Sequence, residues 1–122
     1  MTKSSPDYVA VYSPDFPNAL RKHSAIKKLI QKKVEQILQD PLGPQTERLG
    51  HDLVGLRSAS VKKSFRLIFA VCEECRRLGY QAVNNCFDCA DQPERTVYFF
   101  TVGSHDDAYA IAKRLRSKGR LS

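Results

Sequence analysis

Residues 64–71 read Ser-Phe-Arg-Leu-Ile-Phe-Ala-Val and form the clearest strand in this sequence. Successive side chains of a strand point to opposite faces. One face here would carry Phe65, Leu67, Phe69 and Val71, and the other Arg66, Ile68 and Ala70. A second apolar run, residues 97–102, predicts a neighbouring strand. The cysteine-containing residues 72–96 separate the two strands and are interpreted as an insertion.

The sequence before this strand predicts a first strand and two helices. Residues 8–12 form a short β-rich run. Residues 18–23 predict a short helix, and a second helix begins after Ser24, with apolar residues at helical spacing. This helix should end near Asp40, because Pro41 disfavours helical geometry in the residue before it. We expect the two helices to pack as a hairpin.

The remaining segments complete a single domain. Residues 42–53 predict a loop, residues 55–61 alternate loosely, and a last helix begins at Ser104 and His105. The order is therefore strand, helix, helix, strand, strand, insertion, strand, helix. A chain of 122 residues without a linker predicts one domain, residues 1–122.

The charge of the chain favours an anionic partner. The net charge is +7 and the pI is about 9.4. A small basic domain commonly binds nucleic acid or an acidic protein, although a solvated cationic surface is the simpler alternative. No apolar run is long enough to span a bilayer, and the first residues lack the apolar segment of a secretion signal. We therefore expect a cytoplasmic protein with no membrane partner.

Four cysteines predict a metal site in the insertion. Cys72 and Cys75 form one C-x-x-C pair, and Cys86 and Cys89 form a second. Two such pairs can place four thiolates tetrahedrally around one Zn²⁺. Four sulfur ligands leave no open position on the metal, so we expect a structural zinc rather than a catalytic one. Reduced thiols or disulfides are the alternatives.

Four residues of the predicted strands and final helix could form a catalytic pocket. If the strands pair, Arg57 and Arg66 can lie on a shared face of the sheet. His105 and Tyr109 are four residues apart and would lie on one side of the helix. Arginine binds phosphate, histidine transfers protons, and tyrosine can stack on a base. These groups suit RNA cleavage by attack of a ribose 2′-hydroxyl on the neighbouring phosphodiester, without a metal.

Each of these residues also has a structural interpretation. The arginines could form salt bridges on exposed strands, the histidine could cap the helix, and the tyrosine could belong to the core. Lys62, Lys63 and Arg114 are candidate RNA-binding residues. The two lysines could equally form a solvated turn.

Several short motifs together resemble the RelE/ParE toxin superfamily of toxin–antitoxin systems. They are the Asp40-Pro41 helix end, Gly-Leu-Arg-Ser at 55–58, Phe-Arg-Leu-Ile-Phe at 65–69 and Gly-Ser-His-Asp-Asp-Ala-Tyr at 103–109. The resemblance covers nearly the whole chain outside residues 72–96. It implies an α+β fold in which an N-terminal strand and a helical hairpin pack on a curved antiparallel sheet. A C-terminal helix follows, and the cysteine insertion lies between the last two strands.

The resemblance also implies a function. RelE-like members are ribosome-dependent endoribonucleases that cleave mRNA in the ribosomal A site and are neutralised by a cognate antitoxin. By position, Arg66 matches the strand arginine that holds the scissile phosphate, and Arg57 matches a basic position on the preceding strand. His105 and Tyr109 fall where relatives place catalytic groups after the last strand.

One departure from the family leaves the general base open. Well-studied members carry two lysines on the earlier strand, where this chain has Arg57 and Ala59. His105 is our choice for the base. The alternatives to an mRNA-cleaving toxin are a ParE-like inhibitor of DNA gyrase and a non-catalytic RNA-binding module that uses the insertion.

Overall fold

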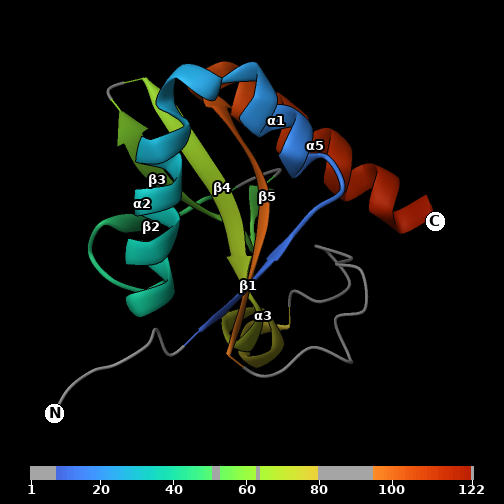
Figure 1. Cartoon of the computed structure of the whole chain (residues 1–122). Coiled ribbons are helices and arrows are strands. Elements are labelled where there is room, and N and C mark those ends of the chain that lie inside the picture. The colour runs from blue at the N-terminus through green and yellow to red at the C-terminus, as the bar shows by residue number, and fades with distance from the viewer. Residues whose placement is uncertain (1–7, 51–52, 63, 80–94, 122) are drawn as a thin grey trace, which may run out of the picture.

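A five-stranded sheet of order β1-β5-β4-β3-β2 forms the centre of the molecule (Figure 1). The computed structural model describes residues 8–50, 53–62, 64–79 and 95–121. The elements are β1 Val9–Tyr12, α1 Phe16–Lys22, the 3-10 turn η1 Ser24–Ile26, α2 Lys27–Gln39, β2 Thr46–Arg48, β3 Arg57–Lys62, β4 Phe65–Val71, α3 Cys72–Leu78, β5 Thr96–Ser104 and α5 His105–Leu121.

The strands β4 and β5 pair antiparallel along their whole length and form the middle of the sheet. Their register runs from Phe65 opposite Ser104 to Val71 opposite Val97. Most of their side chains are fully buried, because helices cover both faces of this pair. The predicted strands at 64–71 and 97–102 are thus confirmed as central strands.

The two faces of the sheet are covered by different helices. Helices α1 and α2 pack with Leu67, Phe69 and Phe99 in one apolar core. Helix α5 packs through Ala108 and Ala112 over the opposite face. None of the helices in the described part of the chain is long and apolar enough to cross a membrane.

The sheet is mixed, whereas we expected an antiparallel one. Strand β1 runs parallel to β5, with Val9 opposite Thr96 and Tyr12 opposite Phe99. Strand β1 can pair with β5 because β4 occupies only one edge of β5 and leaves the other edge for β1. The α+β class, the helical hairpin and the C-terminal helix are confirmed.

Two short elements were not predicted. Strand β2 lies in the segment expected to be a loop, and it pairs with β3 through only three residues. The first residues of the expected insertion form helix α3, which ends at Gly79. Gly79 has φ 79°, the left-handed conformation that favours glycine after a helix. Residues 80–94 of the insertion lie outside the described residues.

Candidate functional site

The two predicted arginines of the strands lie on opposite faces of the sheet. Arg57 is paired with Phe69, whereas Arg66 is paired with Ser60. Paired residues share a face and faces alternate along a strand, so positions 57 and 60 point in opposite directions. Arg57 therefore lies on the face of α1 and α2, and Arg66 lies on the face of α5. The expectation of a shared face was wrong, because it depended on a register that the sequence does not specify.

Arg57 is held in a buried ion pair. Its Nε and Nη2 donate to the two carboxylate oxygens of Glu74 at 3.0 and 3.2 Å, and its Nη1 donates to Thr46 Oγ1 at 2.8 Å. The side chains of Arg57 and Glu74 are only 11% and 6% exposed. The exposed Arg48 adds a longer contact to Glu74, at 3.5 Å. This network fastens α3 to β2 and β3 and occupies the guanidinium that we had expected in a catalytic pocket.

Arg66 is partly buried near the start of β4, and its side chain forms fewer hydrogen bonds than that of Arg57. Its Nη1 donates to Ser60 Oγ at 3.2 Å and to the Phe65 carbonyl at 3.4 Å. Among the described residues, no carboxylate forms an ion pair with Arg66. Its partner on β5 is Gly103, two residues before His105. The backbone of Arg66 therefore lies beside the β5–α5 corner, and its guanidinium extends toward Ser60 on β3.

His105 and Tyr109 stack on each other at this corner. Their ring centroids are 4.3 Å apart with a tilt of 30°. The backbone N–H of His105 donates to the Ser64 carbonyl at 3.0 Å, which joins the corner to the turn between β3 and β4. Tyr109 packs against the core on the α5 side, which is also the face of Arg66. The structure thus brings Arg66, His105 and Tyr109 to one end of the same face.

The arrangement gives the imidazole a defined orientation. His105 Nδ1 lies 3.1 Å from Asp106 Oδ1, and 53% of the His105 side chain is exposed. In the tautomer that carries its proton on Nδ1, this nitrogen donates to the carboxylate, and Nε2 can accept a proton. The corner can therefore supply a cation for a phosphate, a proton acceptor and an aromatic ring.

The predicted RNA-binding residues do not all belong to this corner. Lys62 is exposed at the end of β3, in the turn that contacts His105 through Ser64. Lys63 lies outside the described residues. Arg114 instead lines a cavity on the other side of α5, between this helix and α1.

The structure describes half of the predicted zinc site. Cys72 and Cys75 lie in the first turn of α3, and both are buried. Cys75 Sγ is 3.6 Å from the Gly55 carbonyl oxygen. Cys86 and Cys89 lie outside the described residues. Within the part that the structure describes, no group of three or more metal-ligating residues converges, so the zinc site stays a prediction.

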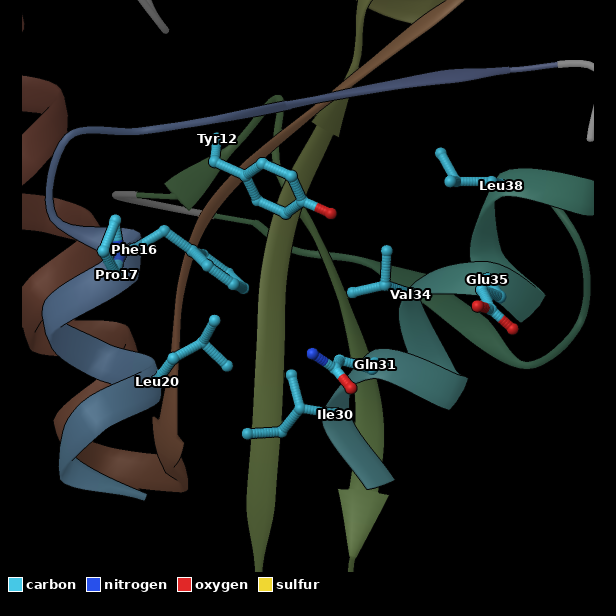
Figure 2. Close-up of a pocket in the computed structure, with 9 residues that line it drawn as sticks. All are labelled: Tyr12, Phe16, Pro17, Leu20, Ile30, Gln31, Val34, Glu35 and Leu38. Carbon is cyan, nitrogen blue, oxygen red and sulfur yellow. The ribbon is translucent and has the colours of Figure 1, made fainter. Parts of the chain in front are cut away.

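An apolar cavity of about 480 Å³ opens between α1 and α2 (Figure 2). Phe16 and Leu20 of α1 face Ile30 and Val34 of α2, and Tyr12 of β1 lies across one end of the cavity (Figure 2). Partial burial raises the pKa of the Tyr12 hydroxyl. This cavity is suited to an apolar ligand or an apolar protein segment.

Sequence reasoning missed His23, which lies at the end of α1 near the same corner. Its ring packs edge-on against Phe65, with centroids 4.9 Å apart. Its Nε2 is 3.6 Å from the position that a Cβ on Gly103 would occupy. No local pattern marks His23, because both contacts are with residues more than forty positions away in the sequence.

Comparison with solved structures identifies the fold. No protein-family model matches the chain, and no curated protein sequence matches it. A mutant of YafQ from Escherichia coli has a TM-score of 0.57 at 11% identity, covering 84% of this chain and 99% of that chain. The toxin–antitoxin complex RelBE2 from Mycobacterium tuberculosis has a TM-score of 0.55 at 16% identity, covering 80% and 98%. A YoeB/ParE toxin from Agrobacterium tumefaciens has a TM-score of 0.53 at 13% identity, covering 79% and 96%. The chain therefore has the fold of RelE-like toxins.

The Arg57–Glu74 pair predicts a stability effect that is separate from any activity. We expect Arg57→Ala to lower the free energy of unfolding by about 3–5 kcal/mol, because it leaves a buried carboxylate without its partner. Arg48→Ala is the matched control, and the exposed position should cost less than about 1 kcal/mol. Urea unfolding followed by circular dichroism measures both values. Equal losses in the two variants would contradict a structural role for the buried pair.

Proposed function

We propose that this protein is the toxin of a type II toxin–antitoxin system and that it cleaves mRNA on the ribosome. The observation that supports the proposal is that the His105–Tyr109 stack follows Gly103, the residue of β5 that is paired with Arg66. The shared fold supports the same conclusion, because the compared structures are toxins or contain them. A ribosomal target also implies action in the cytoplasm.

The proposed reaction uses the three residues in different roles. His105 Nε2 accepts the proton of a ribose 2′-hydroxyl, and the 2′-oxygen attacks the adjacent phosphorus. The guanidinium of Arg66 binds the non-bridging oxygens and stabilises the charge that develops on them. The bond from phosphorus to the 5′-oxygen breaks, and the leaving oxygen takes a proton from water. The hydroxide so formed takes the proton from His105, which restores the neutral imidazole. The products are a 2′,3′-cyclic phosphate and a 5′-hydroxyl end, and the chemistry requires no metal.

The remaining residues support binding rather than chemistry. Tyr109 can stack on a base next to the reacting phosphate, and its own packing on His105 fixes the imidazole plane. Lys62 contributes positive charge at the adjoining turn. Arg57 has no place in this reaction, because its guanidinium is bonded to Glu74 and Thr46 on the other face.

Two substitutions test the proposed chemistry. We expect Arg66→Ala and His105→Ala each to reduce mRNA cleavage on purified ribosomes by at least about 100-fold, because each removes a group that acts in the transition state. Arg48→Ala is the control, since it removes an exposed arginine on the other face. Mapping of RNA ends after incubation with programmed ribosomes measures the effect.

The same preparation distinguishes the alternative functions. Wild-type protein that leaves mRNA intact but blocks DNA supercoiling by gyrase would show a gyrase inhibitor. Intact mRNA together with tight RNA binding, unchanged in Arg66→Ala, would show a non-catalytic RNA-binding module. Either result would overturn the nuclease proposal.

We further propose that the cognate antitoxin binds the apolar cavity between α1 and α2. The cavity is lined mainly by apolar side chains, and Tyr12 at its edge is 47% exposed. Exposed lysines follow α2 beside the cavity at Lys27, Lys28 and Lys32. An amphipathic antitoxin segment would place its apolar face in the cavity and its acidic residues near these lysines.

A charge placed in this cavity should weaken the toxin–antitoxin complex. We expect Leu20→Glu to weaken binding about thirtyfold or more, because the new carboxylate is buried without a partner. Leu29→Glu is the matched control, since Leu29 is 44% exposed and does not line the cavity. Calorimetry with the cognate antitoxin, sought as the product of a small open reading frame next to the gene, measures both. Unchanged affinity for Leu20→Glu, in a variant with a normal melting curve, would exclude this surface.

We also propose that Cys72, Cys75, Cys86 and Cys89 hold one structural Zn²⁺. The first two thiols fit such a site because they lie one helical turn apart on α3, three residues from each other. The metal would join the start of α3 to the later part of the insertion.

Metal analysis tests the zinc proposal directly. We expect purified protein to contain about one zinc per chain, and we expect chelation to lower the melting temperature. Cys89→Ser should lose the metal, whereas Ser104→Ala leaves the cysteines intact and should retain it. Protein that contains no zinc and whose melting temperature is unaffected by a chelator would refute the site.

A further inference from the structure

Besides the side that is buried on the sheet, helix α5 has two sides that border possible binding sites. Ala108 and Ala112 are buried on the sheet. His105 and Tyr109, four residues apart, form the side next to Arg66. Residues 107, 111 and 114 recur at helical spacing on another side, where they line a cavity. This second side is not used by the proposed reaction.

The cavity on the second side lies between α5 and α1 and has a volume of about 570 Å³. Figure 1 shows the two helices beside each other over the end of β5. Ala19, Val102 and Gly103 form its floor. The cavity is therefore a formed recess with a buried base, bordered by two helices.

The walls of the cavity carry several basic groups with few partners. Arg21 and Lys22 come from the last turn of α1, His23 follows them, and Arg114 comes from α5. Lys22 and Arg114 are exposed and form no ion pair within the described residues. Arg21 donates to Asn18, which is neutral. Positive charges that line a recess without internal partners favour an anionic ligand.

Two carboxylates add negative charge to the recess beside its basic groups. Asp15 and Asp107 also line it. Asp15 occupies the N-cap position of α1 but makes no side-chain cap hydrogen bond, so its oxygens are available to a ligand. A ribonucleotide matches both kinds of group, because its phosphate binds cations and its 2′-hydroxyl and base amino groups donate to carboxylates. A bare phosphate would match only the cations.

The recess is next to the proposed catalytic corner. Gly103 belongs to its floor, and the same residue is paired with Arg66 on β4. Neighbouring strands are about 4.8 Å apart. The start of α5 and the width of β5 and β4 therefore separate the recess from the Arg66 guanidinium, which is bonded to Ser60 on β3. A single RNA strand can therefore extend from one site to the other around the beginning of α5.

We propose that the α1–α5 recess binds a nucleotide of the same single-stranded RNA whose phosphodiester is cleaved at Arg66. This inference rests on the proposed nuclease function and adds a second contact to it. Lys22 and Arg114 bind the phosphate of that nucleotide, and Asp15 accepts a hydrogen bond from its ribose or base. These residues position the RNA and take no part in the chemistry.

Neutralising the two cations should weaken RNA binding in a characteristic way. The double variant Lys22→Gln/Arg114→Gln is measured against a single-stranded RNA oligonucleotide by fluorescence anisotropy, in a His105→Ala background that does not cleave it. We expect affinity to fall roughly tenfold at low salt, and the slope of log K against log salt to shrink by about 1.4, since each phosphate contact contributes about 0.7.

A control variant distinguishes the loss of charge in the recess from a loss of charge elsewhere on the protein. Lys27→Gln/Lys28→Gln removes the same charge from exposed positions on α2 that do not line the recess, and its effect should be much smaller. Asp15→Asn should reduce the preference for RNA over DNA of the same sequence. Melting curves confirm that all variants are folded.

The experiments distinguish a failure of the recess proposal from a failure of the nuclease proposal. If wild-type protein cleaves ribosome-bound mRNA but the Lys22/Arg114 double variant binds RNA like the Lys27/Lys28 control, the recess is not an RNA site while the catalytic corner stands. If the double variant loses only antitoxin binding, the recess belongs to a protein partner and the inference is wrong. If wild-type protein neither binds nor cleaves RNA, the underlying function is wrong as well.

Discussion

The antiparallel pairing of β4 with β5 is the interaction on which the other features of this molecule depend. Both strands are buried on their two faces, so the pair forms the floor of two separate cores. Its register sets Arg66 opposite Gly103 and Phe65 opposite Ser104, which brings the arginine to the start of α5. A shift of one residue would turn Arg66 toward α1 and α2 and separate it from Tyr109. The proposed chemistry is thus a consequence of strand register rather than of any single residue.

The arginines on the two faces of the sheet have different roles. On the α1 and α2 face, Arg57 is desolvated and paired with Glu74, so its charge stabilises the attachment of α3. On the α5 face, Arg66 is bonded to a hydroxyl and a carbonyl, and no carboxylate in the described part of the chain pairs with it. The two guanidinium groups therefore differ in burial and in bonding partner. Arg57 has a structural role, whereas Arg66 can bind a phosphate. The stack of His105 on Tyr109 lies only on the second face.

The sequence predicted the strongly patterned elements and failed where distant pairing decides the outcome. Apolar alternation at 64–71 and helical spacing before Asp40 were sufficient to place β4 and α2, and the four-residue spacing of His105 and Tyr109 predicted their contact. The parallel pairing of β1, the three-residue strand β2 and the opposed faces of the two arginines all depend on register between separated segments. Periodicity within one segment contains no information about that register.

The position of β1 has a consequence for the order in which the protein becomes functional during synthesis. Although β1 is among the first segments made, the strand that it pairs with is β5, and Ser13 Oγ donates to the Phe100 carbonyl 87 positions later, at 2.7 Å. Such distant contacts form late, because a long stretch of chain must first be brought together. A nascent chain that lacks residues 96–109 has neither the central pairing nor the histidine–tyrosine stack. A growing polypeptide of this kind would therefore lack the proposed catalytic corner until most of the chain has been translated.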